Sequence, residues 1–287
     1  MRRRHERTNC AEQHPITMVI EGVTPGSHRT KDHLPEAERQ HHVALVLGQG
    51  VSGWVAHDLD HGHVTAMHWA PDADAIRSTD LPNRPRSVTY VILPEWSTLV
   101  PDGAFEPGTA LEHLALVHGR LPIGNVREES VDTLRAQCLY VPDPSNERLI
   151  LERYPIARSL PLQAIIVKGV RSRARLGPAL LMHRGADRLD VAIADRQDLL
   201  LSSSYPARTP EDILYFCLMA AEQAGLRPDD IALRSGGTHL TKGDRDLLSS
   251  YFADHAAAVP STAIGDLPGG MEAERWLAAF DQITCVS

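Results

Sequence analysis

Residues 178–226, PALLMHRGADRLDVAIADRQDLLLSSSYPARTPEDILYFCLMAAEQAGL, carry the pattern that decides the fold. Three apolar runs, PALLMH, RLDVAIA and DLLLSSSY, are separated by segments of hairpin length that contain Gly or Asp. A helix follows, because Thr209 is a natural N-cap, Pro210 suits the first helical position and Gly225 can end a helix in a left-handed conformation. Asp212 completes a capping-box-like pattern with Thr209. The stretch predicts three antiparallel strands and then a helix over 210–224.

Further elements lie on both sides of this stretch, and the upstream half opens with a similar run of strands. Downstream, DIALRS predicts a strand, and helices are expected from Thr241 and over about 272–280. Upstream, HHVALVL, VSGWVAHD, VTAMHWA and PRSVTYVIL predict four short strands, with residues 51–56 pairing with 43–47. We therefore predict a mixed α/β fold built from two ribonuclease-H-like units.

The predicted domains follow from this duplication. Residues 1–40 are polar and rich in His, Arg, Glu and Pro, so we expect a disordered tail. Residues 41–157 form the first ribonuclease-H-like domain, and residues 158–287 form the second, which includes a C-terminal helix. The tail is expected to be dispensable for folding.

Composition limits the possible partners and the location. The formal net charge of -8 makes nucleic acid a poor candidate, since proteins that follow a phosphate backbone are usually basic. The longest apolar runs are too short for a membrane span, and no apolar stretch follows the basic N-terminus as it would in a secretory signal. The four cysteines form no CxxC pair. These features predict a cytoplasmic protein.

Three segments also resemble a known family: TLVPDGAFEPGTALEHLALVHG, VDTLRAQCLYVPD and the stretch that ends in TPEDILYF. Their order and spacing, together with the closing ITCVS, resemble the bacterial family called domain of unknown function 3822, over about residues 42–287. This resemblance implies an actin-like ATPase fold, in which two ribonuclease-H-like domains surround a cleft. It implies no particular activity.

The two predicted phosphate hairpins lack their acids. Active members of the actin-like superfamily place a carboxylate in each hairpin, where it holds the metal or orients the attacking group. Here the corresponding positions are Val46 and His183, and Asp187 and Asp190 lie beyond the second turn. We therefore predict no catalytic residue and no ATP turnover above background.

Several small residues remain candidates for contact with a nucleotide, either ATP or ADP. Gly48 and Gly50 belong to the first hairpin, and Gly236, Gly237 and Thr238 follow the strand DIALRS. Small residues there would let adenine and ribose approach the backbone, but a tight strand-to-helix turn explains the same glycines.

Two other motifs point to competing functions. GQGVSG at 48–53 matches the dinucleotide fingerprint GxGxxG, which requires a helix next, whereas the following residues alternate as a strand does. The histidines and aspartates of 57–68 lack helical metal-binding spacing, so we expect a solvated hairpin tip and no metal site.

The leading prediction is thus a non-catalytic actin-like module that acts through contacts with an unknown protein partner. The alternative is a nucleotide-binding or phosphotransfer enzyme of the actin and sugar-kinase superfamily.

Overall fold

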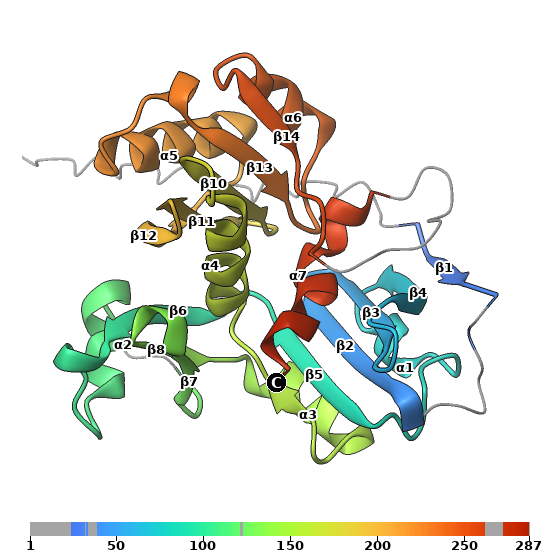
Figure 1. The fold of residues 1–287 in the computed structure, drawn as a ribbon. Coiled ribbons are helices and arrows are strands. Elements are labelled where there is room, and N and C mark those ends of the chain that lie inside the picture. The colour runs from blue at the N-terminus through green and yellow to red at the C-terminus, as the bar shows by residue number, and fades with distance from the viewer. Residues whose placement is uncertain (1–23, 32, 34–38, 121–122, 262–271, 287) are drawn as a thin grey trace, which may run out of the picture.

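The computed structural model describes residues 24–31, 33, 39–120, 123–261 and 272–286. Figure 1 shows a mixed α/β molecule in which two large sheets lie on either side of central helices and a small lobe stands to one side. Within the described residues, no helix is both long and apolar enough to cross a membrane.

The first large sheet has the strand order β1-β4-β3-β2-β5-β9. Its strands are β1 (Gly26–Arg29), β2 (His41–Gly48), β3 (Val51–Asp58), β4 (Val64–Pro71), β5 (Ser87–Ile92) and β9 (Arg158–Ser159). β2, β3 and β4 are antiparallel, whereas β5 and β9 run parallel to β2. The predicted pairing of residues 51–56 with 43–47 is confirmed by the register, in which Val43 faces Ala56 and Leu47 faces Ser52.

The second large sheet repeats this topology in the order β12-β11-β10-β13-β14. Its strands are β10 (Ala179–Arg184), β11 (Arg188–Asp195), β12 (Asp198–Pro206), β13 (Ala232–Gly236) and β14 (Asp254–Ala257). Three antiparallel strands are again followed by two parallel ones. The predicted duplication of a ribonuclease-H-like unit and the predicted actin-like fold are therefore confirmed.

The small lobe is an insertion after β5. It contains a sheet in the order β6-β8-β7, with β6 (Trp96–Pro101), β7 (Arg127–Val131) and β8 (Ala136–Val141), and the helix α2 (Ala110–His118) packs on it. Its core is small: the buried apolar residues are Val100, Ala110, Leu114, Leu139 and Val141.

The remaining helices cover the two large sheets. α1 (Asp74–Arg77) and α3 (Pro144–Arg153) pack on the outer face of the first sheet, and α5 (Pro210–Gln223) and α6 (Lys242–Ser249) on the outer face of the second. α4 (Leu162–Arg173) and α7 (Leu277–Phe280) lie between the two sheets (Figure 1). The 3₁₀ turns are Asp102–Ala104, Asp132–Leu134, Pro228–Asp230, Ala273–Trp276 and Asp281–Cys285.

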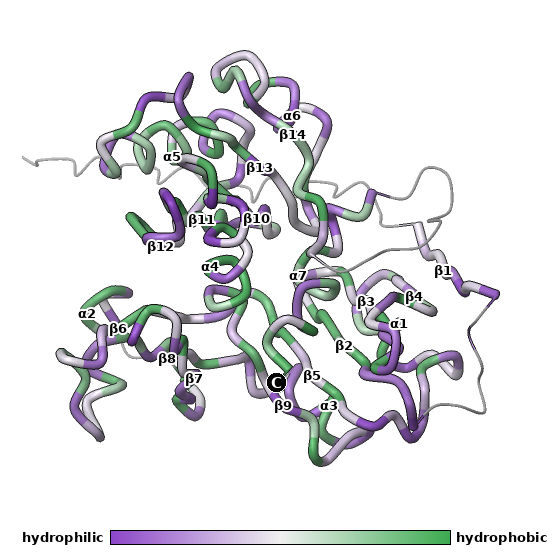
Figure 2. Tube along the Cα trace, viewed as in Figure 1, coloured by the Kyte–Doolittle hydropathy of each residue, from purple (hydrophilic) through white to green (hydrophobic). Residues whose placement is uncertain are grey.

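Side-chain alternation explains why the central strands are apolar throughout. In β2, Val43, Leu45 and Leu47 belong to the core under α1 and α3, while Val46 joins the core around α4 and α7. In β10, Leu181 joins that same central core. One apolar core therefore runs between the two sheets, and the hydrophobic colour along β2, β5 and α4 in Figure 2 follows it.

The N-terminal segment differs in part from the expected disordered tail. Residues 26–29 form β1, which pairs antiparallel with β4, and the Trp69 indole donates a hydrogen bond to the Thr24 carbonyl at 3.0 Å. The edge of β4 supplies backbone partners that the polar composition of this segment does not reveal. Residues 1–23, on which most of the expectation rests, lie outside the described residues.

Candidate functional site

Three turns from the two repeated units meet at one cavity. Gly48 and Gln49 come from the β2–β3 turn, Gly185 to Asp187 from the β10–β11 turn, and Thr238 and His239 from the segment after β13. The full lining is Gly48, Gln49, Leu93, Pro94, His183, Gly185, Ala186, Asp187, Arg188, Asp190, Thr238 and His239. The equivalent ends of the repeated sheets thus face each other, which is where the duplicated fold would place a ligand.

The cavity is small. The space open to a water-sized sphere is ≈ 20 Å³. A single water molecule needs at least about 10 to 15 Å³ by this measure, so the cavity holds about one water. A nucleotide does not fit this cavity as it stands. Gln49, Leu93 and Pro94 also line a second, larger space of ≈ 590 Å³ on the side of the small lobe.

Arg188 makes hydrogen bonds to both halves of the molecule. Its Nε donates to Asp190 Oδ1 at 2.8 Å and its terminal nitrogen to Ser204 Oγ at 2.6 Å, and Ser204 Oγ donates to the same aspartate oxygen at 2.5 Å. The other terminal nitrogen donates to the carbonyl of Glu95, in the segment between β5 and β6. Only 15% of the Arg188 side chain and 9% of the Asp190 side chain are exposed, so this is a buried ion pair within β11. The hydrogen bond from Arg188 to the Glu95 carbonyl links it to the other half.

Glu95, at the same junction, makes hydrogen bonds to the start of α4. The sequence at the start of α4 offers no side-chain cap, since Pro161 precedes Leu162. Glu95, although 67 residues away in the sequence, caps the helix instead. Its two carboxylate oxygens accept hydrogen bonds from the Leu162 and Gln163 amides at 3.0 and 3.2 Å. Burial raises the pKa of Glu95 to about 7, and the neighbouring Arg188 opposes this effect.

The two hairpin positions that would carry acids hold other groups. Val46 is fully buried in the central core. His183 is also fully buried, faces Asp190 across the β10–β11 pair, and makes no hydrogen bond to another residue in the described part of the chain. Burial lowers the pKa of His183 to about 4, so its imidazole is neutral at neutral pH. Neither side chain offers the hard oxygen ligand that Mg²⁺ requires.

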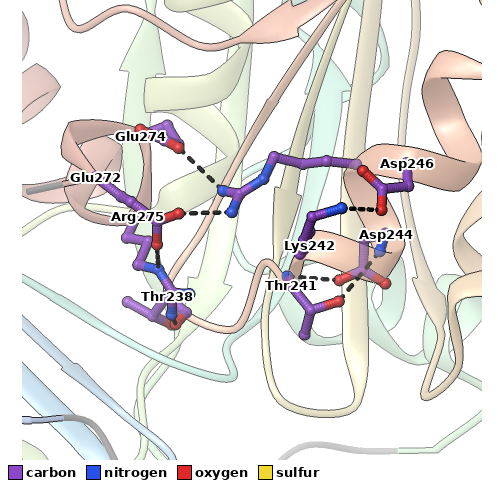
Figure 3. Close-up of polar contacts among 9 residues, drawn as sticks. Thr238, Thr241, Lys242, Asp244, Asp246, Glu272, Glu274 and Arg275 are labelled. Carbon is purple, nitrogen blue, oxygen red and sulfur yellow. Dashed lines mark hydrogen bonds and ion pairs between the residues drawn. The ribbon is translucent and has the colours of Figure 1, made fainter. Parts of the chain in front are cut away.

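The turn after β13 is covered by the segment that precedes α7. Figure 3 shows Glu272, Glu274 and Arg275 beside Thr238. Arg275 donates to the Thr238 carbonyl at 3.4 Å, and the Gly237 amide donates to the Glu274 carbonyl at 2.9 Å. Arg245 of α6 pairs with Glu272 at 2.5 Å and with Glu274 at 3.1 Å. These ion pairs hold the segment over the turn.

The five candidate nucleotide contacts are therefore separated. Gly48 and Thr238 line the cavity, whereas Gly50, at φ +73°, belongs to the β2–β3 turn and is not part of the lining. A Cβ at Gly236 would lie 2.8 Å from the Glu274 carbonyl, and one at Gly237 would lie 2.3 Å from the Arg184 amide nitrogen. The last two glycines are thus required by close packing of the backbone.

Two further features of the site can now be placed. β3 begins at Val51 as a strand paired with β2, so the dinucleotide interpretation of GQGVSG, which needs a helix there, is wrong. Sequence reasoning missed the role of Arg188 and Asp190. Their i, i+2 spacing in the predicted strand RLDVAIA places both on one face, which is the signal that could have linked them.

Comparisons with known proteins agree with this architecture. The model of the family described as "Protein of unknown function (DUF3822)" matches residues 81–253. A Bacteroides thetaiotaomicron protein with an actin-like ATPase fold and unknown function superposes with a TM-score of 0.72 at 17% identity, over 87% of this chain and 98% of that one. No curated protein matches significantly.

Two more distant structures cover similar shares of the chain. The cytoplasmic domain of EpsL from the Vibrio cholerae type II secretion system has a TM-score of 0.46 at 14% identity, over 85% of this chain and 95% of that one. The PilM-PilN type IV pilus biogenesis complex has a TM-score of 0.48 at 11% identity, over 85% of this chain and 97% of that one. Because the family model covers more than half of the chain, and the topology and the Bacteroides structure agree with it, this chain belongs to the DUF3822 family and has an actin-like ATPase fold.

Proposed function

We propose that this chain is a non-catalytic actin-like module that acts through contacts with other proteins. The observation that carries the proposal is the closed junction between the two halves. Arg188, Asp190 and Ser204 occupy it with their own hydrogen bonds and leave space for about one water.

The chemistry of the junction supports the absence of catalysis. Phosphoryl transfer depends on a metal that bridges the phosphates and on a carboxylate that orients the metal or the nucleophile. Asp190 is the buried acid beside the cavity, but Arg188 already neutralises it at 2.8 Å. Asp187 is exposed in the turn after Gly185. No free, buried carboxylate therefore faces the cavity within the described residues.

The small lobe supports a role in protein contacts. α2 exposes Leu116 and Val117 by 83% and 59%, and Ile123, shortly after the helix, is 91% exposed. Large apolar side chains gathered on one small lobe are typical of surfaces that bind another protein. The net charge of -8 also favours a protein partner over nucleic acid.

The alternative function is nucleotide binding or phosphotransfer. The observation in its favour is that Gly48, Gly185 and Thr238, from three separate turns, line one cavity. A nucleotide there would have to displace Arg188 from the Glu95 carbonyl and separate the two halves.

The first experiment measures the melting temperature with and without Mg-ATP, ADP and NAD. A ligand present at about 100 times its Kd adds about 2.7 kcal/mol to the free energy of unfolding, so binding raises the melting temperature. We expect no rise for the wild type. A rise with Mg-ATP that becomes larger in Arg188→Ala would support the alternative.

The second experiment tests the contact surface. Partners that co-purify with the wild type are compared quantitatively with those of the double variant Leu116→Asp, Val117→Asp. Leu176→Asp is the matched control, because Leu176 is 101% exposed after α4 and away from the small lobe. We expect the double variant alone to lose partners. If all three proteins recover the same partners in equal amounts, the small lobe is not the contact surface.

A further inference from the structure

The turn between β3 and β4 brings together three side chains that bind metals. Asp58, His61 and His63 each offer one ligand atom, and these atoms all lie within 4.8 Å of one another. His61 Nδ1 is 3.0 Å from Asp58 Oδ2, and the rings of His61 and His63 have centroids 5.7 Å apart. The solvated tip expected from the sequence is therefore a convergent cluster, and nothing in the proposed function uses it.

Backbone hydrogen bonds hold the turn in this shape. Asp58 Oδ1 accepts the Asp60 and His61 amides at 2.8 and 3.2 Å, which leaves Oδ2 directed toward His61. The Asp58 carbonyl accepts the Gly62 amide at 2.8 Å, and Gly62 has a φ of +69°. This left-handed residue lets the chain reverse so that His63 returns to the side of Asp58.

We propose that Asp58, His61 and His63 form a binding site for a divalent transition metal of the zinc class. Imidazole nitrogens favour Zn²⁺, Cu²⁺ and Ni²⁺, whereas Mg²⁺ requires oxygen ligands in near-octahedral geometry. Zn²⁺ binds nitrogen and carboxylate oxygen at about 2.0 to 2.2 Å, so tetrahedral ligand atoms lie roughly 3.4 Å apart. The Asp58 and His61 ligand atoms, at 3.0 Å, already lie slightly closer together than that. Rotation of His61, which is 71% exposed, and of His63 closes the rest, and water takes the fourth position.

The two histidines of this turn converge without the metal-binding spacing of a helix. The left-handed Gly62 reverses the chain between His61 and His63, so the two rings come together without the i, i+4 spacing of a helix. The site is also separate from the cavity between the halves. β3 runs from the β2–β3 turn to Asp58, which at about 3.3 Å per residue places the two sites more than roughly 20 Å apart.

Isothermal titration with ZnCl₂ tests the proposal on the full chain, after removal of any histidine tag and treatment with a chelator. We expect saturable binding of one Zn²⁺ to the wild type and no binding of Mg²⁺. The double variant His61→Ala, His63→Ala should bind Zn²⁺ at least about tenfold more weakly, as should the milder His63→Gln. Asp60→Asn is the matched control, because it removes a charge from the same turn but no ligand from the cluster, and its affinity should equal that of the wild type.

Circular dichroism and the melting temperature without metal establish that each variant is folded. Two results would overturn the proposal. One is a wild type that does not bind Zn²⁺ saturably. The other is a folded double variant that binds as tightly as the wild type, which would place the metal at other residues of the chain.

Discussion

Glu95→Gln tests whether Glu95, at the junction between the two halves, is as buried as the structure shows. Glu95 is 2% exposed and its carboxyl caps α4 through the Leu162 and Gln163 amides. Burial raises its pKa from an ordinary 4.5 to about 7. The folded protein therefore holds this proton at pH values where the unfolded chain has lost it, and the wild type loses stability as pH rises from 4.5 to 7.

The magnitude follows from the two pKa values. A carboxyl that titrates at 4.5 in the unfolded chain and at about 7 in the folded one lowers the free energy of unfolding by about 3 kcal/mol across that interval. For a chain of 287 residues this corresponds to about 6 to 12 °C in melting temperature. Glutamine does not titrate, so the difference in stability between wild type and variant should shift by up to that amount, in favour of the variant, between pH 5 and pH 8.

The assay is thermal or urea denaturation of both proteins at pH 5, 6, 7 and 8. Glu128→Gln, on an exposed position of β7, is the matched control, since it reports the effect of one surface charge. A wild-type-to-variant difference that stays constant across these pH values would show that Glu95 is solvated and that the junction is open. A shift in the opposite direction would show that the ionised carboxyl is favoured, with Arg188 as the dominant influence.

Three further predictions concern the packing that holds the fold. Gly237→Ala should lower the free energy of unfolding, measured in urea, by about 3 kcal/mol. The reason is that φ is +117° and the new Cβ would lie 2.3 Å from the Arg184 amide nitrogen. Gly103→Ala is the control and should be nearly neutral, because a Cβ there meets open space. Burial lowers the pKa of His42 from 6.5 to about 4, so the unfolded chain takes up the proton first and stability falls as pH drops from 6.5 to 4. In His42→Gln this decrease in the free energy of unfolding should be smaller by up to about 3 kcal/mol, as measured by acid denaturation. A curve identical to that of the wild type would contradict the assignment. Thr209→Ala removes a capping-box side chain of α5 and should cost about 1 kcal/mol in thermal unfolding, whereas no cost would mean that the cap is redundant.

Local signals in the sequence predicted much of the fold. The capping box of Thr209 and Asp212 fixed the start of α5, because both partners lie within one helical turn. The repeated three-strand hairpins predicted the two large sheets, since apolar alternation and turn residues act over a few positions. β6 was not predicted, because WSTLVP is a short run that ends in proline and gains its strand identity from pairing with β8.

The candidate site depends on contacts between residues far apart in the sequence. Glu95 caps a helix that begins 67 residues later, and the carbonyl of Glu95 accepts from Arg188, 93 residues away. No local pattern encodes such partners. The convergence of Asp58, His61 and His63 could not be predicted for a related reason. It depends on the left-handed Gly62 and the hairpin geometry, which the linear spacing does not display.

The most direct test of the closed junction is a phosphate-release assay on the purified full chain with magnesium and millimolar ATP. The filled cavity and the paired Asp190 predict release equal to that of a blank without protein, for the wild type and for Asp190→Asn and Asp187→Ala alike. Turnover that saturates with ATP and disappears in either variant would show that a carboxylate of the β10–β11 hairpin performs catalysis, and would contradict the account of a non-catalytic module.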